Sequence, residues 1–246
     1  MTLPANLLPP PPLAELQQHA RIGLFLDFDG TLVELAPGPD AIAVPADLAV
    51  RLERLGERLG GALALVSGRS AADLRRHLGP GLLTLAGSHG AHIVAPDGSV
   101  LRQGSPLPGA VSEHLRLFAS RSGLLFEEKA HGGALHYRAR PELGDQATDF
   151  AKQLAQHHGL ATKEGKCVIE LVWPGADKGG AAHLLCGNMP FAGTIPVFIG
   201  DDITDEDGFA ACIRMGGFGI KVGEGGATCA RYRLASVKDV FAWLNL

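Results

Sequence analysis

An apolar run at residues 22–26, IGLFL, is followed by two aspartates, Asp27 and Asp29, and then by Gly30 and Thr31. The run does not alternate between apolar and polar positions, which is the pattern of a strand buried on both faces in a parallel sheet. Two residues that lie two positions apart at a strand end point to the same side. The sequence therefore predicts a parallel β-sheet whose first strand ends in two carboxylates that can act on one reacting centre.

Buried strands and helical patterns alternate on both sides of a different middle segment. Toward the N-terminus the alternation consists of a helix within residues 45–60, a strand at 61–66, a helix at 70–78 and a strand at 82–87. Toward the C-terminus it consists of a helix from Lys178, a strand at 195–200, a helix from Thr204 and a strand at 218–222. Strands that alternate with helices pair in parallel through right-handed crossovers, so both parts are predicted to share one α/β core.

The middle of the chain has another order of elements. A helix is followed by strands at 124–129 and 133–138, a second helix at 142–158, and strands at 161–165 and 167–172. Strands in neighbouring pairs predict an antiparallel sheet covered by helices on one face. We therefore expect a Pro-rich leader at residues 1–20, a core at 21–106 and 176–246, and an inserted αββαββ cap at 107–175. The prolines of the leader indicate a stiff, partly disordered segment.

Composition and charge exclude several classes of partner. The chain has 22 lysines and arginines against 26 aspartates and glutamates, so nucleic acid and anionic membrane surfaces are not expected partners. The four cysteines lie far apart without zinc-finger spacing, and we expect free thiols. The first residues lack the basic region of a secretory signal, and no apolar run reaches about 18 residues, so a cytoplasmic protein is predicted. A monomer is slightly favoured, although the sequence leaves the oligomeric state open.

Polar residues gather where the predicted core strands end. They are Asp27 and Asp29, Ser67, Lys178, and Asp201, Asp202 and Asp205. Ligands of an open α/β sheet bind outside the carboxyl ends of its strands, so these side chains are expected in one crevice. Several carboxylates in one crevice repel each other unless a cation lies between them, and hard oxygen ligands suit Mg²⁺. Lys178 and Ser67 would donate to a bound anion, whereas Asp205 or Asp73 taken singly also fits a helix N-cap.

Four motifs in this order resemble those of the haloacid dehalogenase (HAD) superfamily. They are DFDGT at 27–31, SGR at 67–69, DKG at 177–179 and GDDITDED at 200–207. The resemblance implies a HAD-like Rossmannoid parallel-sheet core with an inserted cap. It also implies that Asp27 is a nucleophile that forms an aspartyl-phosphate, while Asp29 protonates the leaving alkoxide and later activates water.

The same resemblance assigns the remaining core residues. Ser67 and Lys178 are expected to stabilise the phosphoryl oxygens. Asp27, Asp201 and the backbone carbonyl of Asp29 are expected to hold Mg²⁺, with Asp202 and Asp205 as support for the metal. Because cleavage of a phosphoester requires a proton for its leaving oxygen and departure of a halide does not, an aspartate at position 29 favours phosphoryl transfer over dehalogenation.

The predicted cap sheet has a polar face. Because side chains alternate along a strand, the two members of each of these pairs lie on the same face: Glu127 and Lys129, His136 and Arg138, and Lys166 and Glu170. Periodicity alone favours a solvated outer face. The alternative is a face that closes over the crevice and forms hydrogen bonds with the hydroxyls of a polar substrate.

Further motifs look like those of trehalose-6-phosphate phosphatases, over nearly the whole chain from about residue 23 to residue 244. They are GSHG at 87–90, EEK at 127–129, HYR at 136–138, GKCVIEL at 165–171 and GIKVGEG at 219–225. This resemblance implies a Mg²⁺-dependent phosphatase that converts trehalose 6-phosphate to trehalose and phosphate, the last step of trehalose biosynthesis. It implies that Glu127, Lys129 and Glu170 contact sugar hydroxyls. It also places His89, Arg138 and Lys166 at the substrate.

Some alternatives stay open at this point. Arg69 either binds phosphate or closes its loop through an ion pair, and Trp173 has no explanation beyond an effect on the hinge of the cap. Another sugar phosphate, such as sucrose phosphate or a mannosyl compound, would require the same core motifs and different cap contacts. A non-catalytic sugar-phosphate sensor is disfavoured, because a binding protein has no need of a nucleophile with an adjacent acid.

Overall fold

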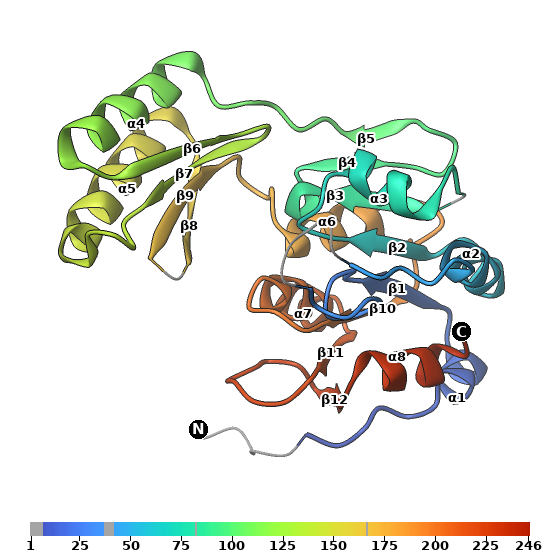
Figure 1. Cartoon of the computed structure of the whole chain (residues 1–246). Helices are drawn as coiled ribbons and strands as arrows, with labels where there is room; N and C mark the ends of the chain where they lie inside the picture. The colour runs from blue at the N-terminus through green and yellow to red at the C-terminus, as the bar shows by residue number, and fades with distance from the viewer. Residues whose placement is uncertain (1–6, 37–41, 82, 166) are drawn as a thin grey trace. The chain divides into compact units, whose positions relative to one another are not determined.

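The chain divides into two compact units in its computed structural model, which describes residues 7–36, 42–81, 83–165 and 167–246 (Figure 1). The core unit consists of Met1–Arg102 and Asp177–Leu246, and the cap unit consists of Gln103–Ala176. The cap expected from the sequence, residues 107–175, lies inside the second of these units. Each unit has its own sheet and its own hydrophobic core.

A mixed sheet forms the centre of the core unit. Its strands are β1 (Ile22–Leu26), β2 (Leu63–Val66), β3 (Thr84–Gly87), β4 (His92–Val94), β5 (Val100–Arg102), β10 (Ile195–Gly200), β11 (Phe218–Val222) and β12 (Tyr232–Leu234). They are arranged in the order β12-β11-β10-β1-β2-β3-β4-β5. Pairing is parallel from β12 to β3, as predicted, whereas β4 and β5 extend the sheet in antiparallel pairing. The sequence did not predict β4, β5 or β12.

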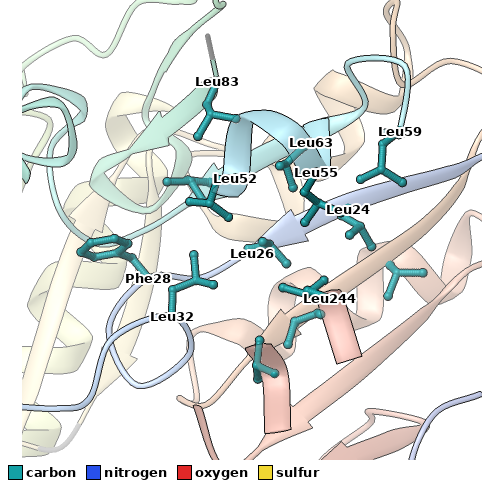
Figure 2. Packing of buried hydrophobic residues seen from close by; sticks show 14 of the residues in the cluster. Leu24, Leu26, Phe28, Leu32, Leu52, Leu55, Leu59, Leu63, Leu83 and Leu244 are labelled. Carbon is teal, nitrogen blue, oxygen red and sulfur yellow. The ribbon is translucent and has the colours of Figure 1, made fainter. Parts of the chain in front are cut away.

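Helices cover both faces of this sheet. They are α1 (Leu13–His19), α2 (Leu48–Arg58), α3 (Ala71–Leu78), α6 (Lys178–Cys186), α7 (Asp205–Arg214) and α8 (Val237–Leu244), with a short 3-10 helix, η2, at Ser88–Gly90. Alternation along β1 directs Leu24 and Leu26 toward α2 and α8, where Leu52 and Leu244 meet them (Figure 2). Phe25 belongs to the opposite face, which α6 and α7 cover. The result is a three-layer α/β structure with β1 buried on both sides.

The N-terminal segment contacts two distant elements of the core unit. The Pro-rich leader at residues 1–20 was expected to be stiff and partly disordered; its described part, residues 7–20, includes α1 and packs on the core unit. Leu13 is buried, the Trp243 indole donates a hydrogen bond to the Pro11 carbonyl at 2.8 Å, and Arg233 N donates to the Leu8 carbonyl at 3.0 Å. The described part of the leader is thus ordered by contacts with α8 and β12, which the local run of prolines does not reveal.

The cap unit has the predicted αββαββ order. Its elements are α4 (Gly109–Ser122), β6 (Leu125–Lys129), β7 (Gly132–His136), a 3-10 helix η3 (Pro141–Leu143), α5 (Gly144–His158), β8 (Ala161–Gly165) and β9 (Val168–Val172). The strands form an antiparallel sheet in the order β6-β7-β9-β8, and α4 and α5 lie on one side of it (Figure 1). Ala147, Ala151 and Ala155 form the buried side of α5, so their small side chains bring the helix close to the sheet.

Trp173 connects the two ends of the cap unit. Its indole N–H lies 3.1 Å from the carbonyl oxygen of Ser105 and 3.3 Å from that of Pro106, so one donor is shared between two acceptors. The Trp173 ring also packs against the hydrophobic core of the cap unit. The residue that the sequence left unexplained therefore holds the segment entering the unit against the segment leaving it. Throughout the described part of the chain, no helix has the length and apolar character needed to cross a membrane.

Candidate active site

Two neighbouring parallel strands bring the first carboxylates together. Strand β1 pairs with β10 in a register that sets Leu26 opposite Ile199, and Asp27 N extends this pairing by donating to the Ile199 carbonyl at 2.9 Å. Asp27 follows β1 and Asp201 follows β10, so both lie at the carboxyl end of the sheet. The buried apolar strands therefore fix the position of two acidic residues at their ends.

A buried ion triad lies at this edge of the sheet. Lys178 Nζ donates hydrogen bonds to Asp27 Oδ1 at 2.8 Å and to Asp205 Oδ1 at 2.7 Å. Lys178 is the first residue of α6, where the side chain of Asp177 caps the helix by accepting from Gly180 N at 2.6 Å. The three charged residues are only 2%, 4% and 0% exposed for Lys178, Asp27 and Asp205. Charges this deeply buried are tolerated because each is paired and hydrogen-bonded.

Burial also controls the protonation of these groups. Burial raises the pKa of Asp27 and of Asp205, and the nearby Lys178 ammonium acts in the opposite direction. Burial, together with the charges of Asp205 and Asp202, raises the pKa of Asp201 to about 6. Burial lowers the pKa of Lys178, but its two carboxylate partners outweigh that effect and raise it overall, so the lysine is a permanent cation. Lys178 alone does not neutralise three carboxylates, and further positive charge beside them would stabilise their ionised forms.

The acidic cluster has the donor set of a hard metal ion. Asp27, Asp201 and Asp205 offer oxygens that all lie within 4.8 Å of one another. Asp201 Oδ1 is buried, and no described residue gives it a hydrogen bond. An unsatisfied buried carboxylate oxygen is costly, and a cation with oxygen ligands such as Mg²⁺ would satisfy it. The residues present therefore fit the magnesium ion that the sequence predicted.

The backbone leaves space for the Asp201 carboxylate. Gly30 has φ +76°, and a Cβ at this position would lie only 2.2 Å from Asp201 Oδ2. Glycine tolerates this backbone conformation and the close approach at once. The Asp202 side chain is exposed, and its Oδ1 accepts a hydrogen bond from Ile203 N at 2.6 Å. Asp205, in contrast, is one of the three residues of the carboxylate cluster.

Ser67 and Arg69 lie in the loop between β2 and α3. Ser67 is 1% exposed, follows β2 and accepts a hydrogen bond at its Oγ from Arg69 N at 3.2 Å. The Arg69 guanidinium donates to both oxygens of Asp29, at 2.7 Å each, and to Asp73 Oδ2 at 2.8 Å. These bonds, above all those to Asp29, raise the pKa of Arg69. Of the two alternatives for Arg69, the structure shows the ion pair, and its partner is the predicted acid.

His89 lies against the same loop. Its ring packs on Gly68, where an added Cβ would be 2.8 Å from His89 Cε1, and His89 N donates to the Ser67 carbonyl at 2.8 Å. Ser88 and His89 have φ of 51° and 55°, a left-handed conformation that non-glycine residues seldom adopt. Backbone strain of this kind is concentrated at functional sites. The structure therefore places His89 beside Ser67, within the core unit.

The cap sheet has one polar face, opposite to its helices. The Lys129 ammonium binds Glu170 Oε1, and His136 Nε2 lies 2.8 Å from Glu127 Oε2. The register Glu127–Ala134–Glu170 continues to Lys163, a residue of the same face that the sequence analysis overlooked. Among the other predicted residues, Arg138 is exposed in the turn after β7, and Lys166 lies outside the described residues. The structure thus brings together Glu127, Lys129, His136, Lys163 and Glu170.

The family follows from a comparison with known sequences. The model of the trehalose-phosphatase family matches residues 25–238. The chain belongs to the trehalose-phosphatase family. As a member of this family it is an enzyme that hydrolyses phosphoric monoesters.

Individual relatives and solved structures agree with this assignment. The trehalose-6-phosphate phosphatase of Escherichia coli is 39% identical over 242 residues, which span 96% of this chain and 90% of the relative. The Aspergillus fumigatus trehalose-6-phosphate phosphatase structure has a TM-score of 0.76 at 28% identity, with 95% of this chain and 94% of the other covered. A HAD superfamily phosphatase from Bacteroides thetaiotaomicron has a TM-score of 0.67 at 16% identity, with 92% and 94% covered, which concerns the fold alone. The HAD-like fold expected from the sequence motifs is confirmed.

Two residues of the core unit have contacts that their sequence positions did not predict. Asp205, expected as support for the metal, is fully buried and bonded to Lys178. Lys221, to which the motif GIKVGEG assigns no role, is buried in β11, and its ammonium reaches the carbonyl oxygens of Asp201 and Asp202. A signal for it was present in the sequence, because one lysine interrupts the otherwise apolar run FGIKV.

Proposed function

We propose that this trehalose-phosphatase family member hydrolyses trehalose 6-phosphate to trehalose and phosphate, depends on Mg²⁺, and forms an aspartyl-phosphate at Asp27. The observation that carries the proposal is the pairing of Asp27 with Lys178 beside the unsatisfied oxygen of Asp201. The names of the relatives supply the substrate. The free cysteines of the described chain fit a reducing compartment such as the cytoplasm.

Asp27 is the nucleophile in this mechanism. Its carboxylate bonds to phosphorus while the phosphorus–oxygen bond to the sugar breaks, and the departing oxygen takes a proton from Asp29. Water then attacks the aspartyl-phosphate, loses a proton to Asp29, and releases phosphate with Asp27 restored. Burial raises the pKa of Asp27, and the charge and hydrogen bond of Lys178 oppose that rise and so favour the ionised carboxylate. Lys178 and Ser67 donate to the phosphoryl oxygens as charge shifts onto them.

Arg69 controls the state of Asp29. Both Asp29 oxygens accept hydrogen bonds from Arg69, and a fork of two parallel charged donors binds an ionised carboxylate most strongly. The observed arrangement is that of the base form, which activates water in the second half of the reaction.

Magnesium would be held by the carboxylates of Asp27 and Asp201 and by the backbone carbonyl of Asp29. When bound, it neutralises negative charge on the transferring phosphoryl group. Asp205 orients the site, because Oδ1 accepts from Lys178 and Oδ2 accepts from Asp202 N at 2.9 Å. Asp202 contributes to the support of the metal through its charge.

We assign the sugar to the polar face of the cap unit. Glu127, Lys129 and Glu170 provide both donors and acceptors, which suits the many hydroxyls of a disaccharide. Resemblance adds His89, Arg138 and Lys166 to the substrate site. A phosphatase for another sugar phosphate would keep the core residues and differ on this face.

The test is phosphate release from trehalose 6-phosphate, sucrose 6-phosphate and glucose 6-phosphate, each measured with Mg²⁺ and with a chelator. We expect Mg²⁺-dependent turnover with a strong preference for trehalose 6-phosphate. Asp27→Asn is expected to abolish turnover, whereas the matched change at an exposed cap-unit aspartate, Asp149→Asn, is expected to leave it unchanged. Equal turnover of all three compounds would discard the sugar assignment, and an active Asp27→Asn protein would discard the mechanism.

A further inference from the structure

A second buried lysine lies beside the acidic cluster. Lys221 is 8% exposed, and every residue of its strand β11 is buried. In the parallel pairing of β11 with β10, Lys221 lies opposite Gly200, the residue that immediately precedes Asp201. Lysine is almost never buried unless its charge has partners, because removing an ammonium from water is costly. The position of Lys221 therefore points to a specific task.

The partners of Lys221 are main-chain carbonyl groups. Its ammonium donates to the carbonyl oxygen of Asp201 and to that of Asp202, the latter at 3.3 Å. Both carbonyls belong to the turn that leads from β10 toward α7. Lys221 thus binds the backbone of this turn, while the Asp201 carboxylate remains available to the acidic cluster.

The turn is held from a second side by Asp205. Asp202 N donates to Asp205 Oδ2 at 2.9 Å, so the N–H and the C=O of Asp202 have separate charged partners. Gly200 makes this possible, because a Cβ there would lie 2.1 Å from Asp205 Cγ. The Asp201 carboxylate lies in the space left by Gly30, where an added Cβ would be 2.2 Å from Asp201 Oδ2.

We propose that Lys221 is a positioning residue that fixes the Asp201–Asp202 turn and thereby directs the Asp201 carboxylate at a divalent cation. This rests on the proposed Mg²⁺ dependence. Lys221 itself touches neither the cation nor the substrate. Its effect is on the shape of the cation site, through the two carbonyls that it binds.

Two effects of Lys221 on Mg²⁺ binding have opposite signs. A positive charge near the site repels Mg²⁺, so removal of the charge alone would tighten binding. Loss of the two carbonyl bonds would release the turn and weaken binding. If Lys221 positions the turn, its removal weakens Mg²⁺ binding. If Lys221 is only a nearby positive charge, its removal tightens Mg²⁺ binding.

The experiment is calorimetric titration of MgCl₂ into the chelator-treated full chain. Lys221→Met keeps the length of the side chain and removes its charge and donors. Lys221→Arg keeps the charge but replaces a compact donor by a planar one. Lys238→Met is the matched control, because Lys238 is exposed on α8. Partners that orient metal ligands are typically worth 10–100-fold in metal affinity, so we expect Lys221→Met to raise the Mg²⁺ dissociation constant by about 10–100-fold.

We expect a smaller increase in the Mg²⁺ dissociation constant for Lys221→Arg and no change in it for Lys238→Met. An unchanged or lower dissociation constant in a folded Lys221→Met protein overturns the proposal and leaves the phosphatase mechanism intact. If Lys221→Met does not fold, Lys221→Gln, which retains one donor group, takes its place with the same two outcomes. If the wild-type chain binds no Mg²⁺, the proposed function falls and the role of Lys221 falls with it.

Discussion

Arg69 binds both carboxylate oxygens of Asp29 at 2.7 Å, while its remaining amino group binds Asp73 at 2.8 Å. The Arg69 side chain is only 8% exposed. Asp73 thus fixes Arg69, and Arg69 fixes the residue proposed as general acid and base. A fork of parallel donors holds a carboxylate in one plane, which a single ammonium cannot do.

Arg69→Lys is therefore expected to lower kcat for a sugar phosphate by about 10–100-fold, which is part of the roughly 10²–10⁴-fold that general acid catalysis contributes. The loss should be smaller for an aryl phosphate, because its leaving group departs without a proton. Steady-state kinetics on both substrates measure this difference. Arg75→Lys, at an exposed position of α3, is the control and should match wild type. Equal losses on the two substrates would contradict a role in placing the acid.

Gly30→Ala is expected to abolish Mg²⁺ binding and turnover, because its methyl group would occupy the space of the Asp201 carboxylate. Gly60→Ala is the matched control, since Gly60 has φ +62° and nothing lies within 4 Å of an added Cβ. This control measures the loss of stability that comes from a side chain in the left-handed backbone conformation alone, about 1–2 kcal/mol, and its activity should be unchanged. Calorimetry with MgCl₂ and thermal melts separate the two effects. A Gly30→Ala protein that still binds Mg²⁺ would exclude this arrangement of Asp201.

Asp201 should make the stability of the metal-free protein depend on pH. Burial raises the pKa of Asp201 to about 6, whereas an unfolded aspartate titrates near its ordinary value of about 3.9. Between these values the folded state binds more protons than the unfolded state, so stability falls as pH rises from about 4 to about 6. Asp201→Asn cannot ionise and avoids this loss.

In chelator above pH 6, Asp201→Asn is therefore expected to melt higher than wild type, by about 2–4 °C if the gain is near 1 kcal/mol. Water screens part of the charge on this half-buried group, which keeps the gain small. The difference should vanish toward pH 4 and reverse in Mg²⁺, which stabilises only the protein that binds it. If wild type and Asp201→Asn have the same melting temperature in chelator at every pH, burial of the ionised Asp201 carboxylate does not destabilise the protein.

Lys129 is the cap residue whose removal should affect substrate choice. Lys129→Met removes the partner of Glu170 and one donor to the sugar, so KM for trehalose 6-phosphate is expected to rise by about 10–100-fold, as for one charged hydrogen bond. KM for a small aryl phosphate should stay near wild type. Lys152→Met is the control, because Lys152 pairs with Glu164 on the helix side of the same sheet. A parallel rise in KM for both substrates would contradict a sugar-binding role.

Trp173→Phe removes the indole donor that Ser105 and Pro106 share. The expected cost is about 1 kcal/mol, the usual worth of a hydrogen bond, and it should fall on the cap unit. Hydrogen exchange is expected to become faster in β7 and β9 and to stay unchanged in β1 and β10. Trp243→Phe, which loses its bond to Pro11 in the core unit, should leave exchange in β7 and β9 unaltered. Unchanged exchange in Trp173→Phe would mean that the indole bond does not stabilise the unit.

The parts of the fold that the sequence predicted are those with strong local patterns. Strands β1 and β10 are unbroken apolar runs, and both were predicted with their observed bounds. Strands β4, β5 and β12 have three residues each, too few for a periodic pattern, and they depend on neighbouring strands for their conformation. Helix α1 escaped prediction for a similar reason, because its burial depends on α8.

In the candidate site, too, the sequence predicted some features and not others. Asp27 and Lys178 were identified from motifs at predicted strand and helix ends, and the structure joins them. Asp205 is bonded to Lys178, and Gly200 leaves space for its side chain, which no local pattern in the sequence indicates. The partners of Arg69 come from tertiary contacts with Asp29 across 40 positions of sequence. Local sequence patterns therefore identify such residues, but they do not predict their hydrogen-bond and ion-pair partners.

The indole bond of Trp173 brings residues 105 and 173 within hydrogen-bonding distance, although 68 positions of sequence separate them. A segment whose ends adjoin can be inserted into a chain, or exchanged for another, without altering the path of the chain on either side. Residues 103–176 thus have the form of a cassette. With the sugar assigned to this unit as proposed above, exchange of such a cassette would change the choice of sugar and leave the phosphate chemistry of the core unit intact.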